Sequence, residues 1–462
     1  MRNDLQNIKK ALQKNKDFFD QGNTRDVSFR LEQLKTLKQI LESNEGLINE
    51  ALEKDLGKSP FISFVTELGL IYQEINIFLA KLKAWSRMKK VKTSLMHFWA
   101  KSYIYREPYG TVLILSPWNY PLQLSLLPLV GAIGAGNTVV LKPSELAPAT
   151  ASLMKKLFTD HFEEGLITVI EGDKEVSKLL LKEKFDYIFF TGSQPVGKQV
   201  MKAAAENITP ITLELGGKSP CIVHSDANID LAARRIVWGK YLNCGQTCIA
   251  PDYLYVHEGI KEKCMEKATE YIKKFYGENP LLSSDYNRII NKNHYDRLLR
   301  LLNNGRLVYG GTVNAEELYI SPTIIDQVGW EDPVMQEEIF GPILPVLTFR
   351  NVDEAISMIK KLPKPLALYV FSEDAAVQDM FVKGIQCGGG CINDTIIHAS
   401  SPYLPLGGVG ESGMGIYHGR TSYNTFTHAK SIIKKSNLID IGWRYPPYAG
   451  KLNILKRIAR WF

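Results

Sequence analysis

Five short apolar runs, rich in β-branched residues, lie between residues 111 and 215, and each is followed by a turn and a helix-like stretch. Strands that alternate with helices in this way predict a parallel, doubly wound sheet. Ligands of such sheets bind at the carboxyl ends of the strands, so we expect a site built from the turns SPWN, KPSE and TGSQPVG. The runs are TVLIL (111–115), TVVL (138–141), LITVI (166–170), YIFF (187–190) and ITLEL (211–215).

The segments on either side predict further elements. Residues 2–90 carry apolar residues at helical spacing among many charges, which is typical of packed surface helices. Residues 96–110, MHFWAKSYIYREPYG, partly alternate and predict an edge strand or a protruding hairpin. From about Glu214 to Leu406 a second series of strands and helices indicates another α/β domain, and SIIKK (431–435) is a possible further strand. A chain of 462 residues has room for two or three domains.

Composition excludes several classes of protein. With 45% hydrophobic and 23% charged residues, the chain is typical of a soluble globular protein. Six cysteines and no signal peptide at MRNDLQNIKK indicate reduced thiols in the cytoplasm. Of the net charge of +7, the last twelve residues supply four positive charges and no negative one, so the body gives no support to a nucleic-acid footprint.

Residues 111–141 form an uncharged stretch long enough to suggest a membrane span. Pro117, Pro121 and Pro128 interrupt it, so a buried strand followed by a loop and a helix is the better interpretation.

Two glycine-containing loops could bind phosphate. Gly408, Gly410 and Gly413 match G-x-G-x-x-G, but SPYLPL precedes them instead of a strand, so we interpret them as a loop that needs permissive backbone. TGSQPVG follows YIFF directly and opens a helical stretch, where free N–H groups attract an anion. The alternative interpretation of TGSQPVG is an ordinary strand-to-helix turn.

The turn LKPSE offers Lys142 and Glu145 at a strand end. A glutamate there can accept hydrogen bonds from ribose hydroxyls. It can also simply open a helix, with Ser144 as the N-cap and Glu145 in the first turn, and both interpretations can hold together.

Cys244 and Cys248 lie four residues apart in YLNCGQTCIAP. A structural zinc site needs two more ligands, and no second C-x-x-C or H-x-x-H pair is present in the sequence. A cysteine hydrolase needs a histidine to activate the thiol, and none of the eight histidines lies in a supporting motif. Spacing alone therefore leaves the role of the pair open.

Seven sequence blocks together resemble the aldehyde dehydrogenase superfamily, in its order and over nearly the whole chain. They are PWNYP, LKPSE, TGSQPVG, TLELGGKSPCIV (212–223), GQTCIAP (245–251), EEIFGP (337–342) and LGGVGESGMG. Details such as DPVMQEEIFGP, PLALYVFS, GMGIYHG and RYPP look most like the class 3 branch, of fatty and medium-chain aldehyde dehydrogenases.

The resemblance implies an α/β fold in three parts. These are a Rossmann-like NAD(P)-binding domain (1–97 and 108–213), an α/β catalytic domain (214–405) and a small β oligomerisation arm (98–107 and 425–440), followed by a basic amphipathic tail (441–462). It also implies a cytoplasmic homodimer that oxidises aldehydes to carboxylates with NAD or NADP. Hydrophobic, medium- to long-chain aldehydes are the expected substrates.

By the same resemblance, Cys248 matches the nucleophile, which forms a thiohemiacetal and then a thioester. The Asn119 side chain and the Cys248 backbone N–H match the oxyanion donors. Glu214 matches the general base for the hydrolytic water, and its apolar neighbours are expected to raise its pKa. No metal is implied.

Six positions match the cofactor site of the family. Glu338 corresponds to the residue that holds the nicotinamide ribose, whereas Glu337 is expected to be structural. Glu145 should favour NAD by repelling a 2′-phosphate, although the branch tolerates NADP. The complete set is Trp118, Lys142, Glu145, Gly192, Ser193 and Glu338.

Three features remain open. Cys244 stands where the family more often has Ser or Ala, so an oxidised link to Cys248 is one possibility and a small buried residue is the other. Gly390 stands where valine is common. Residues 451–462 place apolar side chains on one helical face and Lys456, Arg457 and Arg460 on the other, which fits peripheral membrane contact as well as docking onto protein. The apolar face comprises Leu452, Ile454, Leu455, Ile458, Trp461 and Phe462.

Two other enzyme classes stay open beside the dehydrogenase. A CoA-acylating aldehyde dehydrogenase would pass the thioester to a thiol instead of water, and the presence of Glu214 argues against it. A cysteine hydrolase or esterase would need no nicotinamide cofactor.

Overall fold

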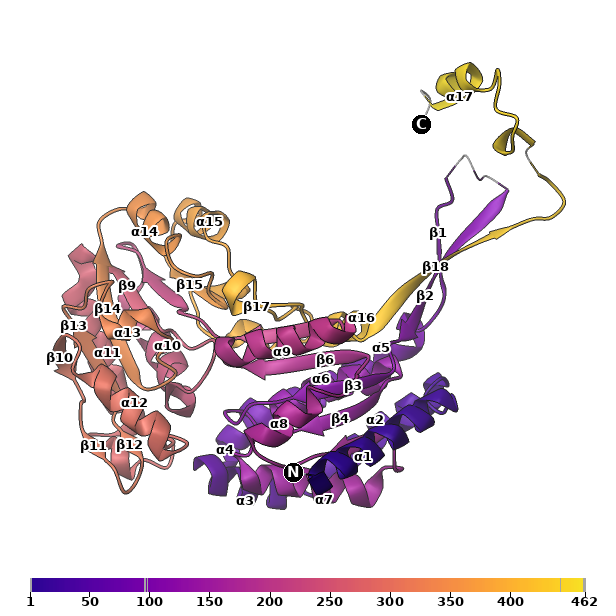
Figure 1. Cartoon of the computed structure of the whole chain (residues 1–462). Coiled ribbons are helices and arrows are strands. Elements are labelled where there is room, and N and C mark those ends of the chain that lie inside the picture. Colours follow the sequence, from indigo (N-terminus) through magenta and orange to yellow (C-terminus); the bar gives the residue numbers. More distant parts are fainter. Residues whose placement is uncertain (1, 95–96, 98, 441, 460–462) are drawn as a thin grey trace.

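The computed structural model describes residues 2–94, 97, 99–440 and 442–459. A first α/β lobe lies between a second α/β lobe and a long arm (Figure 1). The five predicted strands are confirmed and form the sheet of the first lobe in the order β7-β6-β3-β4-β5, all parallel. They are β3 (Thr111–Leu115), β4 (Thr138–Lys142), β5 (Ile167–Val169), β6 (Tyr187–Gly192) and β7 (Ile211–Leu215).

Helices cover both faces of this sheet, which is the reason that its strands read as continuous apolar runs. Val112 and Ile114 of β3 face one core, whereas Leu113 and Leu115 face the other. The helices after the strands are α6 (Gln123–Ala135), α7 (Pro148–His161), α8 (Lys174–Leu180) and α9 (Gln194–Asn207). The uncharged stretch 111–141 is therefore β3, a loop, α6 and β4, as predicted.

The N-terminal segment is helical, as expected. It comprises α1 (Arg2–Asp20), α2 (Val27–Ser43), α3 (Glu45–Leu56), α4 (Pro60–Ser63), the π-helix η1 (Phe64–Leu68) and α5 (Gly69–Trp85). By length and composition, the continuous helix Pro60–Trp85 could cross a membrane. Its residues Ile71, Ile75 and Phe78, however, are fully buried in the core of the first lobe.

A helix start at Ser144, one of the two interpretations of LKPSE, is not observed. Helix α7 begins at Pro148, because a residue that precedes proline, here Ala147, is disfavoured in the helical region. Ser144 instead accepts a hydrogen bond from the Leu146 N–H at 3.2 Å. The N-terminal N–H groups of α7 donate to Asp55 of α3, at 3.0 Å from Ala149 and 2.8 Å from Thr150.

The second lobe is the other predicted α/β unit. Its sheet has the order β10-β13-β14-β9-β8-β15-β16, parallel except for β10 on β13. These strands are β8 (Pro220–Val223), β9 (Tyr253–His257), β10 (Arg306–Tyr309), β13 (Thr323–Asp326), β14 (Ile343–Phe349), β15 (Ala367–Phe371) and β16 (Gly389–Ile392). The small hairpin is β11 (Val313–Asn314) with β12 (Tyr319–Ile320), and the helices are α10 (Ile229–Tyr241), α11 (Lys261–Tyr276), α12 (Lys292–Leu302), α13 (Pro333–Gln336), α14 (Val352–Ile359) and α15 (Ala375–Gly384).

Two glycine positions are explained by close backbone approach. A Cβ on Gly390 would lie 1.9 Å from the Leu368 carbonyl oxygen of the neighbouring strand, so a larger residue would require a different backbone. A Cβ on Gly408 would lie 2.0 Å from the Ser412 carbonyl oxygen, and Gly410 has a φ of +66°. The G-x-G-x-x-G match is thus a tight loop that ends in β17 (Gly413–Met414), which pairs antiparallel with β7.

The predicted hairpin exists, but its main strand is not an edge strand. In the arm, β2 (Ala100–Pro108) lies between β1 (Lys89–Val91) and β18 (Thr427–Lys435), because nine residues of β18 pair with it. Residues 96 and 98 of the predicted segment 96–110 lie outside the described part of the chain. Helix α16 (Gly419–Thr425) packs against α5 and α6 at the base of the arm (Figure 1).

The tail lies beyond the far end of the arm, away from both lobes (Figure 1). It contains a short helix, α17 (Leu452–Ala459), on which Leu452 and Leu455 are exposed. Arg460, Trp461 and Phe462 of the predicted amphipathic face lie outside the described residues.

Candidate active site

A cavity of about 420 Å³ opens where residues of the two lobes meet. The first lobe contributes residues after β3, β6 and β7, and the second contributes Cys248, part of α12 and the loop after α13. The cavity thus contains seven of the nine predicted site residues. Its lining is Pro117, Trp118, Asn119, Leu124, Thr191, Gly192, Ser193, Gln194, Pro195, Glu214, Leu215, Gly216, Cys248, His294, Arg297, Glu337, Glu338 and Phe340.

Sheet topology explains why distant segments meet here. Strands β3, β6 and β7 are parallel neighbours, so Trp118, Gly192 and Glu214 lie at the same edge of the sheet. Lys142 and Glu145 lie at the corresponding end of β4 but do not line the cavity. Their side chains form an ion pair at 2.7 Å, with Lys142 nearly buried and Glu145 about one-third exposed.

A turn with unusual backbone geometry precedes Cys248. Asn243 and Cys244 have φ values of +53° and +57°, and Gly245 has +71°. A Cβ on Gly245 would lie 2.3 Å from the Gly341 carbonyl oxygen, so glycine allows the two loops to approach. Gln246 fixes the turn through its side chain, which donates to the Arg288 carbonyl at 3.0 Å and accepts from the Ile290 N–H at 3.0 Å.

The Cys248 thiol is strongly perturbed. Burial, and then the neighbouring Glu338 and Glu214 carboxylates, raise its pKa to about 12, while backbone N–H groups act in the opposite direction. Cys248 therefore holds its proton in this arrangement. Loss of negative charge at either carboxyl, or a positive charge in the cavity, would favour the thiolate.

Cys244 has a different environment from Cys248. It is fully buried in the core of the second lobe and is absent from the cavity lining. Burial raises its pKa to about 12, and Tyr286 hydrogen-bonds to it. All six cysteines are free thiols. Cys244 therefore fits the role of a small buried residue.

Asn119 is held from several sides. It is only 2% exposed, and its side-chain Nδ2 donates to the Gln246 carbonyl at 3.0 Å. Its own carbonyl oxygen accepts from Lys58 Nζ at 3.0 Å and from Asn243 Nδ2 at 2.9 Å. An amide carries two N–H groups, so one remains for an oxygen bound in the cavity.

Glu214 is a buried carboxyl with an unpaired atom. Its Oε1 has no hydrogen-bond partner, and burial raises its pKa well above the ordinary value, in the expected direction. Since buried polar atoms are nearly always hydrogen-bonded, an unpaired carboxyl oxygen facing a cavity indicates a place for water or a ligand.

Glu338 approaches the chain after β7 closely. A Cβ on Gly216 would lie 2.0 Å from Glu338 Oε2, so the absence of a side chain at residue 216 makes room for this carboxyl. Burial raises the pKa of Glu338 to about 8, and Asp252 contributes to the rise. Lys218 anchors the same loop through the carbonyls of Val334 at 2.8 Å and Glu337 at 2.9 Å.

Sequence reasoning missed His294, Arg297 and Phe340, which also line the cavity. The ring of His294 lies 5.1 Å from that of Trp118, and burial lowers its pKa. Arg297 donates to the Ile339 carbonyl at 2.6 Å and pairs with Glu337 at 3.3 Å, which agrees with a structural role for Glu337. His294 and Arg297 lie on α12, and helical periodicity does not tell which of its residues border a cavity. Phe340 lies in the block EEIFGP, but no role was predicted for it.

The cavity fits a dinucleotide cofactor. Ser193 is the N-cap of α9 and makes no side-chain cap bond, so the first N–H groups of that helix are available to an anion. The Thr191 hydroxyl beside it is buried and unpaired. Among the described residues, no group of three or more His, Cys, Asp or Glu side chains is arranged to hold a metal ion.

The strand ends of a doubly wound lobe, with the buried Glu214, face Cys248 and Glu338 of the second lobe, an arrangement that fits a nucleotide-dependent oxidoreductase. The model of the Aldehyde dehydrogenase family matches residues 2–432. Staphylococcus aureus 4,4'-diaponeurosporen-aldehyde dehydrogenase is 49% identical over 451 residues, which cover 97% of this chain and 98% of that protein. The Rattus norvegicus enzyme named aldehyde dehydrogenase, dimeric NADP-preferring, is 42% identical over 450 residues. These residues cover 97% of this chain and 99% of that protein.

A solved structure agrees with this assignment. The substrate-bound state of Staphylococcus aureus AldH superimposes with a TM-score of 0.96 at 49% identity, covering 98% of this chain and 99% of that one. The chain therefore belongs to the aldehyde dehydrogenase family, in its class 3 branch. It is an oxidoreductase that oxidises aldehydes with NAD or NADP.

Proposed function

We propose that oxidation proceeds on the Cys248 sulfur and that Asn119, Glu214 and Glu338 each serve one part of the reaction. The observation that carries the proposal is that these four side chains line one cavity, although they lie at four distant places in the sequence. The overall reaction converts aldehyde, NAD(P)⁺ and water into carboxylate, NAD(P)H and two protons.

In the first step, the Cys248 thiol releases its proton to solvent and attacks the aldehyde carbon as a thiolate, and the carbonyl oxygen becomes an oxyanion. The free N–H of Asn119 and the Cys248 backbone N–H donate to this oxygen. The bond from Asn119 to the Gln246 carbonyl holds the amide in place beforehand, so little reorganisation is needed. A bound NAD or NADP supplies the acceptor for the hydride that leaves the adduct carbon.

In the second step, Glu214 accepts a proton from the water that hydrolyses the Cys248 thioester. A carboxylate with a raised pKa is a stronger base than an ordinary one. Its unpaired Oε1 is the atom that would accept the water proton. Carboxylate is then released and the thiol is restored.

Cofactor binding is assigned to the remaining predicted residues. Glu338 would hold the nicotinamide ribose, and Gly192 and Ser193, at the start of α9, would bind the pyrophosphate. Lys142 and Glu145 would hold the adenosine ribose, consistent with their place at the end of β4. Trp118 forms part of the wall between the two lobes. Use of both cofactors is tested by measuring kcat/KM with NAD and with NADP.

The proposed substrates are hydrophobic medium- to long-chain aldehydes. Much of the cavity lining is apolar, including Leu124, Leu215 and Phe340. Exposed Phe61 and Phe64 lie on the α4–η1 segment that packs near the start of α6. A series of straight-chain aldehydes from two to sixteen carbons should show kcat/KM rising with length, and a preference for the shortest members would contradict the proposal.

We also propose a cytoplasmic homodimer formed through the arm, with the tail as a peripheral membrane contact. A long exposed arm is typical of an oligomerisation element, and the rat relative is named dimeric. The exposed Leu452 and Leu455 beside Lys456 and Arg457 support membrane contact. Deleting residues 447–462 should abolish co-sedimentation with anionic liposomes and leave the sedimentation coefficient of a dimer; undiminished co-sedimentation would exclude the tail as the anchor.

The alternatives make different products. A CoA-acylating enzyme would form acyl-CoA from aldehyde, NAD⁺ and CoA, and the buried Glu214 beside Cys248 argues against it. A cysteine hydrolase would cleave esters and reduce no NAD(P)⁺ with any aldehyde. Product analysis by mass spectrometry, with and without CoA, separates the three.

A further inference from the structure

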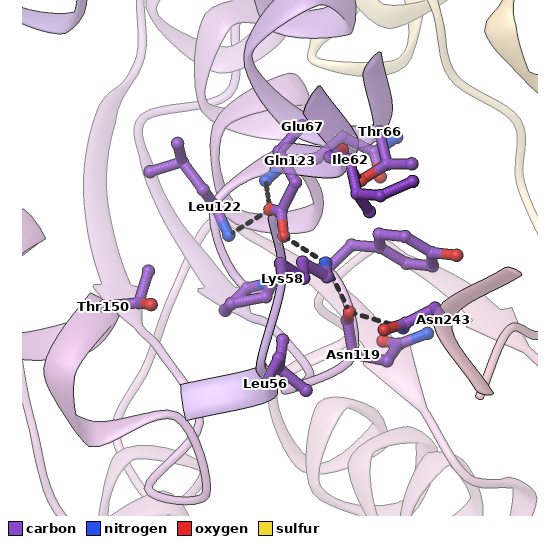
Figure 2. A network of polar contacts seen from close by, with 12 residues as sticks. Leu56, Lys58, Ile62, Thr66, Glu67, Asn119, Leu122, Gln123, Thr150 and Asn243 are labelled. Atoms are coloured by element: carbon purple, nitrogen blue, oxygen red, sulfur yellow. Dashed lines mark hydrogen bonds and ion pairs between the residues drawn. The ribbon is translucent and has the colours of Figure 1, made fainter. Parts of the chain in front are cut away.

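Lys58 and Glu67 form an ion pair that is completely buried in the first lobe, at 2.5 Å between Nζ and Oε1, with neither side chain exposed (Figure 2). The removal of two charges from water is costly, and an apolar pair of similar volume is often at least as stable. Stability alone therefore does not explain why these two residues occupy this place.

Both partners hold the loop that carries Asn119 (Figure 2). Lys58 Nζ donates to the Asn119 carbonyl oxygen at 3.0 Å. Glu67 Oε2 accepts from the backbone N–H groups of Leu122 and Gln123, both at 2.9 Å, at the start of α6. A carboxylate is favourable at a helix N-terminus, so Glu67 also stabilises the beginning of α6. The pair thus fixes the loop 119–123 at both ends.

The geometry of Lys58 leaves it little freedom. Its ammonium group donates to Glu67 and to Asn119, and it lies 4.2 Å from the centre of the Tyr120 ring, a favourable cation–π distance. Asn119 in turn is fixed by Asn243 on the same carbonyl oxygen and by Gln246 at its side chain. Lys58 therefore contacts the backbone of the residue whose amide faces the cavity, without lining the cavity itself.

We infer that Lys58 and Glu67 are positioning residues that hold the Asn119 amide where the oxyanion forms. This inference rests on the proposed role of Asn119 as an oxyanion donor. Removal of one such donor typically lowers the rate about 10²–10³-fold, so a displaced donor should cost a sizeable part of that factor.

The test uses two reactions of the same thiol in the full-length enzyme. Acylation of Cys248 by 4-nitrophenyl acetate passes through an oxyanion and needs the donor, whereas alkylation by iodoacetamide forms no oxyanion. The main variant is Lys58→Met/Glu67→Gln, which buries no unpaired charge and keeps an acceptor for the α6 N–H groups. It removes the ion pair, the Lys58 bond to Asn119 and the Lys58 contact with the Tyr120 ring. We expect acylation to fall at least about tenfold and alkylation to stay within about twofold.

Lys261→Met/Asp326→Asn is the matched control. This pair, at 2.8 Å, is partly buried, and Asp326 also pairs with Arg306 at 3.0 Å. It links α11 to β13 away from the cavity. We expect it to change neither reaction. Circular dichroism and thermal unfolding of all variants report whether they fold.

Asn119→Ala, alone and combined with the main variant, completes a double-mutant cycle. If the Lys58–Glu67 pair acts through Asn119, adding Lys58→Met/Glu67→Gln to Asn119→Ala should lower the acylation rate by no more than about twofold. A further tenfold loss there, an equal fall in acylation and alkylation, or wild-type acylation in the main variant would overturn the inference. Wild-type acylation by Asn119→Ala alone would instead overturn the proposed donor, and the inference with it.

Discussion

The substitution Gly216→Ala tests the placement of Glu338 with a single methyl group. Gly216 has no positive φ, so alanine fits its backbone without strain and the effect is steric. The added Cβ would lie 2.0 Å from Glu338 Oε2 and 2.4 Å from Cδ and Oε1. The carboxyl group therefore has to move, whereas the strand that precedes Gly216 does not.

The size of the effect follows from these distances. To reach an ordinary contact of 3.4 Å, Oε2 has to retreat by about 1.4 Å, the difference between 3.4 and 2.0 Å. A misplacement of about 1 Å in a positioning group costs on the order of 10²-fold in rate. We expect kcat/KM for the cofactor to fall about 10²-fold. The free energy of unfolding should change little, because the end of a flexible side chain can rotate away.

We would measure kcat/KM by steady-state kinetics with NAD and NADP, and cofactor affinity by fluorescence titration of the reduced cofactor. Thermal unfolding reports the change in stability. Gly217→Ala is the matched control, because its Cβ would lie at an ordinary 3.4 Å from Pro365 Cα and its backbone N–H, which bonds to Glu338, is retained. Wild-type kcat/KM and cofactor affinity in Gly216→Ala would refute the assignment of Glu338 to the cofactor. Equal losses in both variants would refute the steric argument.

Cys248→Ala should abolish NAD(P)H formation while cofactor titration stays normal; residual turnover measured by absorbance would exclude Cys248 as the nucleophile. Glu214→Gln should give a burst of NADH in stopped-flow and then turnover slowed about 10²–10⁴-fold, and its steady rate should lose the acidic limb of the pH profile; an unchanged steady rate would remove Glu214 as the base. Burial raises the pKa of Glu74 to about 7 from 4.5, so the folded state retains a proton that the unfolded state has released, and stability should fall as pH rises between these values. Glu74→Gln should therefore gain stability over the wild type on going from pH 5 to pH 8, by up to about 3 kcal/mol in urea unfolding; equal pH dependence would show that Glu74 titrates normally.

The sequence predicted the first sheet well because local pattern and burial agree there. Strands covered on both faces are continuous apolar runs, and β3 and β7 begin and end where TVLIL and ITLEL do. The start of α7 was predicted wrongly because its N–H groups bond to Asp55, which belongs to another helix and is almost a hundred residues away. For residues 96–110 the sequence left an edge strand and a protruding hairpin open, because a strand pattern does not reveal that β18 pairs with β2.

The sequence likewise predicted some residues of the candidate site and not others. Family blocks indicated Cys248, Glu214 and Asn119, and the sheet topology brings their segments together. Lys58 and His294 could not be found from the sequence. Each lies on a helical segment or a loop beside one, with no motif, and reaches the site only through tertiary packing.

A mass spectrum of the trapped intermediate shows directly whether Cys248 carries the acyl group. Glu214→Gln is mixed with excess aldehyde and NAD⁺, quenched in acid within the burst and digested. We expect one acyl group on the peptide that contains Cys248, in an amount equal to the NADH formed, and an unmodified Cys244. NADH formed without an acylated Cys248, or an acyl group on another cysteine, would contradict this expectation.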